Sequence, residues 1–355
     1  MWKNILKISI VMALPITSSV AFSKGLSLSL WKEYKENFIS RDGRIIDYQN
    51  GQISHSEGQG YGMLLSLIYN DKNTFDLVWR WTKDNLQVRK DNLFAWKWGK
   101  RSNGKWQVID YNNATDGDIL ITYALLKAFK KWKDEDYKKY AIEILKDIRE
   151  ELSISWKDHI FLLPGYSGFE GKDFFILNPS YFILPVFRLF SKFDNKKFWE
   201  EISYDSIWLF SKARFGLLEL PSDWILLGKN KISIYEERSI YFGCDAIRVP
   251  LYLCVEKGKC ITNILSSIGG SIIELYKKIS YVPVRIDLVY DSLSLKDAPS
   301  GYYAIYARVA KSIGEESISK KLFKTAEQKL SLDKKNYYFF SLYLLAKDWK
   351  DEQDK

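Results

Sequence analysis

Three acidic residues stand where a loop meets a predicted helix: Glu57, Asp116 and Asp245. They lie in the segments SEGQGYGM, ATDGD and CDAIRVP, beside glycines that allow a backbone or a ligand to approach closely. A pair of carboxyl groups can hydrolyse a glycosidic bond, because one protonates the leaving oxygen while the other attacks the sugar or activates water. The chain also contains 13 Trp and 23 Tyr, which can serve as sugar platforms or fill the core.

Each of these acids also has an ordinary structural explanation. Ser56 could cap a helix whose dipole Glu57 complements, and Asp116 could itself be a cap. Asp245 and Arg248 are one helical turn apart, so they could form a local ion pair; equally, Arg248 could keep a catalytic carboxylate ionised and oriented. Since a helix N-terminus favours the carboxylate, Glu57 can act as an acid only if burial or a nearby anion retains its proton.

The elements that must position these residues are mainly helices. Apolar residues recur three and four apart in twelve stretches: 25–39, 57–70, 72–87, 115–133, 136–153, 179–192, 196–213, 243–256, 261–278, 299–313, 315–330 and 334–347. Short polar or Gly-containing turns separate most of them, so neighbours should pack as antiparallel pairs. Six such pairs predict an all-α (α/α)6 barrel with short β-hairpins in its loops. An α-solenoid is the competing architecture, but the sequence has no repeat of fixed length.

A few segments carry β signals. Asn50-Gly51 lies between alternating residues in 45–55, which predicts a hairpin with a type I′ turn. Residues 105–110 and 160–163 predict short strands. Residues 214–242 predict a long irregular loop over one face.

Taken together and in this order, the three segments resemble glycoside hydrolase family 8. ATDGDILITYALLKAFKKW looks like the signature of that family, with Thr122 where the family usually has Ala. SEGQGYGM, AWKW (95–98), NPSY (178–181) and CDAIRVPLYL match further landmarks. The resemblance runs from about residue 25 to 345.

The resemblance implies an inverting endo-β-1,4-glucanase (a cellulase) that needs no cofactor. Glu57 would be the general acid, Asp245 the base that activates water, and Asp116 a residue that binds and distorts the sugar. Inversion requires the two carboxyl groups to be roughly 6.5–9.5 Å apart. Arg248 would orient Asp245. The candidate sugar contacts are Tyr181, Trp96, Trp98 and Tyr61.

One residue departs from the family pattern. Cys244 precedes Asp245, whereas the family commonly has Tyr before the base, so a ring or hydroxyl could be missing from a subsite. Two alternatives to a cellulase stay open. One is a xylanase or mixed-linkage glucanase of the same family. The other is a catalytically impaired glycan-binding partner of cellulose export.

The N-terminus predicts a secretory signal peptide over residues 1–23, followed by one catalytic domain over residues 24–355. Lys3 and Lys7 precede an apolar stretch, 8–16, that is too short to span a membrane, and small residues follow it. An uncleaved anchor is the alternative. We therefore expect a periplasmic or secreted protein. A single domain behind a signal peptide also resembles the cellulase that accompanies bacterial cellulose synthesis, which makes that machinery a candidate partner.

Charge and residue usage limit other functions. The formal charge of +9 falls to +7 without Lys3 and Lys7, and segments such as KKWKDED (130–136) mix both signs, which is typical of solvated helix faces and not of a nucleic-acid-binding surface. With only two histidines and no Cys/His spacing for zinc, we expect no metal. The three cysteines leave two alternatives: a Cys254–Cys260 disulfide, or three small buried thiols.

Overall fold

The structure is a computed structural model that describes residues 17–350, with side chains from residue 27 onwards. The first 16 residues of the predicted signal peptide lie outside this range. Helix α1 (Thr17–Phe38) begins earlier than the predicted residue 25, because the segment TSSVAFSK holds no Pro or Gly that would interrupt it. Within residues 17–350, no helix combines the length and the apolar character that a membrane span needs.

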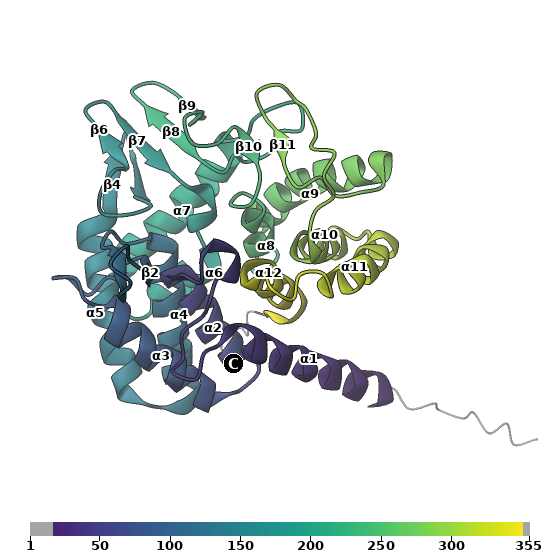
Figure 1. The fold of residues 1–355 in the computed structure, drawn as a ribbon. Coiled ribbons are helices and arrows are strands. Elements are labelled where there is room, and N and C mark those ends of the chain that lie inside the picture. Colours follow the sequence, from purple (N-terminus) through teal and green to yellow (C-terminus); the bar gives the residue numbers. More distant parts are fainter. Residues whose placement is uncertain (1–16, 351–355) are drawn as a thin grey trace, which may run out of the picture.

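Within residues 17–350, six helices form an inner ring: α2 (Ser56–Ile68), α4 (Thr115–Trp132), α6 (Leu184–Phe190), α8 (Arg248–Leu253), α10 (Ser300–Ser312) and α12 (Tyr337–Asp348). Each one packs on the next in this order, and α12 packs on α2, so the ring closes (Figure 1). This closure confirms the predicted barrel and is incompatible with an open solenoid.

Six further helices surround this ring: α1, α3 (Lys72–Leu86), α5 (Glu135–Leu152), α7 (Lys196–Lys212), α9 (Lys259–Ile279) and α11 (Glu316–Leu330). From α3 to α11, each outer helix packs on the inner helix that precedes it in the chain, and α1 packs on α12. The first and last helices of the described residues, α1 and α12, therefore form the sixth helical pair.

Burial explains which helices lie inside. In α4, every residue from Thr115 to Leu126 is buried, because neighbouring elements contact this helix on all sides. In α5, the buried residues instead follow one stripe: Tyr137, Ala141, Ile144, Leu145, Ile148 and Leu152. Such three- and four-residue spacing is that of an amphipathic helix with one face toward solvent.

Two inner helices are shorter than predicted. Residues 179–183 precede α6, because Pro179–Tyr181 forms a 3-10 turn in which the Asn178 side chain accepts the N–H of Ser180. Residues 243–247 precede α8, because backbone N–H groups in this segment bind the carboxylate of Asp223.

The strands form small sheets in the loops of the barrel (Figure 1). One sheet joins β1 (Ser54–His55), β2 (Lys97–Lys100) and β3 (Trp106–Asp110), and a second joins β4 (Ser153–Trp156) to β5 (His159–Leu162). A third contains β6 (Glu170–Gly171), β7 (Phe174–Leu177), β8 (Ile225–Gly228) and β9 (Ile232–Ile234), and a fourth joins β10 (Tyr241–Phe242) to β11 (Ile286–Asp287). The strands predicted at 105–110 and 160–163 correspond to β3 and β5.

Two β predictions are wrong in detail. Residues 214–242 are not a plain loop, since β8 pairs with the distant strand β7, from Phe174 opposite Gly228 to Leu177 opposite Ile225. The turn in 45–55 is wider than a two-residue type I′ turn, because Asp47 pairs with Ile53. Asp47 also accepts the N–H groups of Gln49 and Asn50, and the positive φ angles fall on Gly51 and Gln52.

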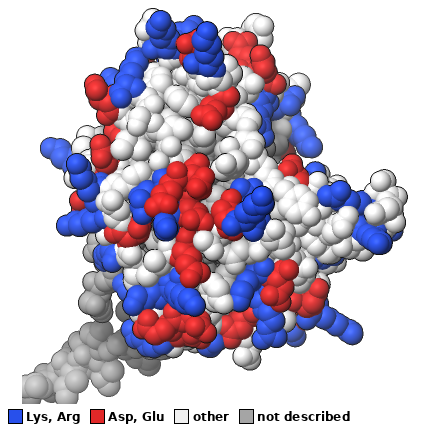
Figure 2. Space-filling view, turned by 90° about the vertical axis from the view of Figure 1, so that its left-hand side faces the viewer, with Lys and Arg blue, Asp and Glu red and all other residues white. Residues whose placement is uncertain are grey.

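The charges on the surface are mixed. On the face that Figure 2 shows, Lys and Arg are interspersed with Asp and Glu, as the mixed charged segments predicted.

All three cysteines have free thiols: Cys244 and Cys260 are exposed and Cys254 is half-buried. The Cys254–Cys260 disulfide that the sequence allows is not formed, and the alternative of three buried thiols is also wrong.

Candidate active site

The three predicted acids meet where the first turns of α2, α4 and α8 come together. Glu57 is in the first turn of α2, Asp116 is in the first turn of α4, and Asp245 lies just before α8. The side chain of Arg248, the first residue of α8, reaches all three carboxylates. The structure therefore brings these four predicted site residues into a single cluster.

Arg248 does more than form a local ion pair. Its Nη2 donates to Oδ1 of Asp245 at 2.8 Å, whereas its Nη1 donates to Oδ2 of Asp116 at 3.1 Å and to Oε1 of Glu57. The guanidinium is almost fully buried, with a side-chain exposure of 2%. A buried guanidinium needs several acceptors, and here carboxylates from three separate segments provide them.

A glycine at the start of α4 makes this cluster possible. A Cβ atom on Gly117 would lie 2.2 Å from Oγ of Ser56 and 2.9 Å from the backbone N of Glu57, so a larger residue would force α2 and α4 apart. The capping explanations are wrong, because the N-cap residues are His55 and Ala114. Oγ of Ser56 is buried and has no hydrogen-bond partner among the described residues.

The environment of Glu57 favours its protonated form, although a helix N-terminus by itself favours the ionised carboxylate. Burial raises the pKa of Glu57 to about 8, assisted by the charges of Asp116 and Asp245 and opposed by Arg248. Burial also raises the pKa of Asp116, although Arg248 acts in the opposite direction. At neutral pH, Glu57 therefore retains a proton that it can donate.

Asp245 is fixed from two sides. Arg248 binds one of its carboxylate oxygens, and Nε1 of Trp224 donates to the other at 3.0 Å. The backbone around Asp245 is held by Asp223, whose Oδ1 accepts three backbone N–H groups at 2.8–3.1 Å, those of Gly243, Asp245 and Ala246. Burial and the charge of Asp245 raise the pKa of Asp223 to about 7. Asp223 thus sets the backbone path of the segment that carries Asp245.

The sequence interpretation missed Asp223 and Trp224, together with two tyrosines of α12. Oη of Tyr337 donates to Oε2 of Glu57 at 3.4 Å, and Oη of Tyr338 donates to the backbone carbonyl of Cys244. The Ser-Asp-Trp triplet (222–224) inside an aromatic-rich loop is a signal that could have identified the first two. A Tyr pair at a helix start carries no comparable signal, because it also fits an ordinary core.

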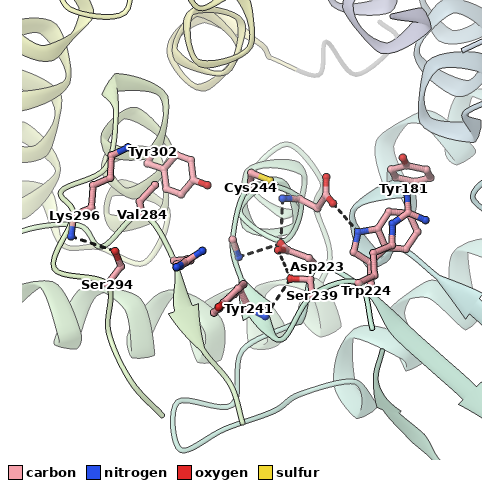
Figure 3. A pocket seen from close by; sticks show the side chains of 14 residues that line it. Tyr181, Asp223, Trp224, Ser239, Tyr241, Cys244, Val284, Ser294, Lys296 and Tyr302 are labelled. Carbon is pink, nitrogen blue, oxygen red and sulfur yellow. Dashed lines mark hydrogen bonds between the residues drawn. The ribbon is translucent and has the colours of Figure 1, made fainter. Parts of the chain in front are cut away.

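Two cavities open at this cluster and together form a cleft. The smaller one, about 340 Å³, is lined by Glu57, Asp116, Asp245 and Arg248 among others. The larger one, about 840 Å³, shares Tyr181, Cys244 and Asp245 with it, so the two meet beside Asp245. Figure 3 shows the larger cavity, with Trp224 and Tyr181 on one side, Lys296 and Tyr302 on the other, and Asp223 and Cys244 between them.

The predicted sugar contacts separate into two groups. Tyr181 and Trp96 line the smaller cavity, as a sugar contact must. Tyr61 does not: it is fully buried, and its hydroxyl lies 3.3 Å from Oε1 of Glu57, so it can position Glu57 but cannot touch a ligand. Trp98 lines neither cavity and instead stacks on Trp106, with their ring centroids 5.2 Å apart. The structure therefore does not support Tyr61 or Trp98 as a sugar contact, because each side chain packs against other residues of the fold and lines neither cavity.

The cluster has the parts that hydrolysis of a glycosidic bond requires. A carboxyl group that retains its proton, Glu57, and a carboxylate that a guanidinium orients, Asp245, line one cleft. The described residues contain no group of three or more His, Cys, Asp or Glu side chains arranged to hold a metal ion.

Comparisons with known proteins agree with this chemistry. The family model described as glycosyl hydrolases family 8 matches residues 5–352. An endoglucanase of Cellulomonas uda is 35% identical over 246 residues, which is 69% of this chain and 68% of the relative. The solved structure of an endo-β-1,4-glucanase from Acetobacter xylinum is 31% identical and covers 91% of this chain and 97% of its own, with a TM-score of 0.79. An endo-1,4-D-glucanase of Vibrio fischeri gives a TM-score of 0.82 at 25% identity, over 90% of this chain and 94% of its own.

Proposed function

The chain belongs to glycosyl hydrolase family 8, and from this membership we propose that it is an endo-β-1,4-glucanase that hydrolyses internal bonds of a cellulose-like chain with inversion. The observation that carries the proposal is the contact of one buried guanidinium, Arg248, with the carboxyl groups of Glu57, Asp116 and Asp245 at the meeting point of two cavities.

Each carboxyl group takes a separate role in this mechanism. Glu57 donates its proton to the glycosidic oxygen as the bond to the sugar breaks, and its raised pKa keeps this proton available at neutral pH. Asp245 removes a proton from a water molecule that attacks the opposite face of the sugar. Arg248 and Trp224 hold Asp245 as an oriented carboxylate. Asp116, buried beside them, binds the sugar at the cleavage point.

The test is hydrolysis of cellohexaose, a neutral oligosaccharide, by the wild type and by Glu57→Gln and Asp245→Asn. Each variant should lose about 10²–10⁴-fold in rate, which is the usual contribution of a general acid or base. Glu151→Gln and Asp136→Asn make the same chemical changes at exposed positions and should retain full activity. In the wild type, ¹H NMR should detect the α-anomer as the first product, because inversion at a β-bond yields it.

The outcomes separate the alternatives. Faster hydrolysis of xylan or of mixed-linkage glucan than of cellohexaose would assign the chain to the corresponding specificity. A folded wild type that binds these glycans without hydrolysing them would instead support the glycan-binding partner. The gathered carboxylates argue against that outcome, since a binding protein has no need for an acid that retains its proton.

We also propose that the chain is exported by a cleaved signal peptide and that it acts on cellulose in the periplasm or outside the cell. The support is the pattern of Lys3, Lys7 and the apolar residues after them. Determination of the N-terminus of the mature protein would test this, with cleavage expected near residue 23. A mature chain that retains Met1 and stays with the membrane would support the uncleaved anchor. A link to the cellulose-synthesis machinery would appear as altered cellulose output when the gene is deleted.

A further inference from the structure

Three exposed cationic side chains line the larger arm of the cleft: Arg238, Arg285 and Lys296. From these three cations we infer that the larger arm binds an acidic substituent, a carboxylate or a phosphate ester, carried by the glucan chain. The inference rests on the proposed function and adds a class of substrate to it. These groups can donate hydrogen bonds to the hydroxyls of a neutral glucan, but their charge adds attraction only for an acidic substituent.

The three cations have no carboxylate partner among the residues that the structure describes. The acidic groups in the same lining are Asp223 and Asp245, and both are already engaged. Asp223 accepts backbone N–H groups and the hydroxyl of Ser239, whereas Asp245 accepts from Arg248 and Trp224. The lining of the larger arm therefore keeps an excess of positive charge.

The two arginines lie over aromatic rings that a neutral sugar would otherwise use as platforms. The guanidinium carbon of Arg238 lies 3.7 Å from the centre of the Trp224 ring, and that of Arg285 lies 4.5 Å from the centre of the Tyr241 ring. Cation–π attraction holds a guanidinium in such a position, while its N–H groups remain available to an anion. This arm of the cleft consequently offers guanidinium groups where bare ring faces would suit an unsubstituted sugar.

The cavity that these cations line is continuous with the catalytic centre. Lys296 lies across this cavity from Trp224 (Figure 3). Asp245 lines both arms of the cleft. A glucan chain cut beside Asp245 therefore extends into the larger arm, where a substituent on it meets the cations. Guanidinium and ammonium groups form short charge-assisted hydrogen bonds to carboxylate and phosphate oxygens.

The test compares kcat/KM on carboxymethylcellulose, which is anionic, with kcat/KM on hydroxyethylcellulose, which is neutral, for the full-length protein. The double variant Arg285→Gln/Lys296→Gln should lower the ratio of these two constants about three- to tenfold, as expected for two partly exposed charge pairs, because the loss on carboxymethylcellulose should exceed any loss on hydroxyethylcellulose. Raising the salt concentration should lower the same ratio in the wild type, because salt screens exposed charges.

A matched control is Lys320→Gln/Lys324→Gln on the outer helix α11, which removes two exposed charges that line neither cavity. This control should leave the ratio at the wild-type value. An equal loss in both double variants would show an effect of net charge alone and would overturn the inference. An unchanged ratio in Arg285→Gln/Lys296→Gln would also overturn it. Failure of the wild type to hydrolyse either polymer would instead contradict the proposed function.

Discussion

Arg248 contacts the carboxyl group of Glu57 although the two residues are 191 positions apart in the chain. The contact joins the start of α8 to the start of α2 across the inner ring, and the same guanidinium also binds Asp116 and Asp245. One side chain therefore joins the two proposed catalytic groups. Four predictions follow from this arrangement and from the segments that support it.

The pH dependence of activity should reflect Glu57. Its protonated form is the active one, so kcat/KM on a neutral substrate should be maintained below the pKa of about 8 and should fall as the pH rises through that value. Asp116→Asn removes a charge that raises this pKa, so the alkaline fall should move to lower pH. Tyr61→Phe removes a hydrogen bond that lowers it, so the fall should move to higher pH. Shifts of the same sign in the two variants would contradict this assignment.

Replacement of Arg248 should be among the most damaging single changes. Arg248→Gln leaves three largely buried carboxyl groups without their shared cation, and we expect a loss of about 3–5 kcal/mol in the free energy of unfolding. The loss should be larger at pH 8 than at pH 5, since Arg248 lowers the pKa values of Glu57 and Asp116 and the carboxyls accept protons more readily at low pH. Urea unfolding at both pH values measures the difference. A loss independent of pH would show that packing dominates.

Gly117 should be required at the junction of α2 and α4. Gly117→Ala places a Cβ atom 2.2 Å from Oγ of Ser56, so we expect a loss of roughly 1–3 kcal/mol in stability and a fall in kcat on the order of tenfold or more. Gly270→Ala is the matched control, because a Cβ there meets no atom within 4 Å inside the helix α9. That change should stabilise the protein by about 0.4–1 kcal/mol and leave kcat unchanged. Thermal unfolding and cellohexaose kinetics distinguish the two.

Asp223 should act as a positioning residue for Asp245. Asp223→Ala leaves three backbone N–H groups without their acceptor, so kcat should fall and stability should drop by about 1–3 kcal/mol. Asp223→Asn keeps a carbonyl oxygen at the same place and should restore most of kcat. Steady-state kinetics with both variants checks this rescue. Equal losses of kcat in the two variants would indicate that the negative charge of Asp223 matters instead.

The sequence was sufficient to predict the helices and the main acids. The twelve apolar stretches correspond to the twelve helices of the described chain, because three- and four-residue spacing is a local property that each helix carries by itself. The same holds for Glu57, Asp116 and Asp245, whose motifs are local. The strand β8 was not predictable in this way, since its pairing with β7 depends on residues about 50 positions away.

Tertiary structure alone decided how these local parts act together. Tyr61 and Trp98 are aromatic residues of the kind that often contact sugars. In the folded chain, however, the hydroxyl of Tyr61 lies against Glu57, and the ring of Trp98 stacks on that of Trp106. Asp223 supports Asp245 only because their segments fold against each other. The raised pKa of Glu57 likewise depends on burial and on charges from distant segments. Periodicity and motifs are encoded over a few residues, whereas burial, charge coupling and the shape of a cleft arise only when the ring of helices closes.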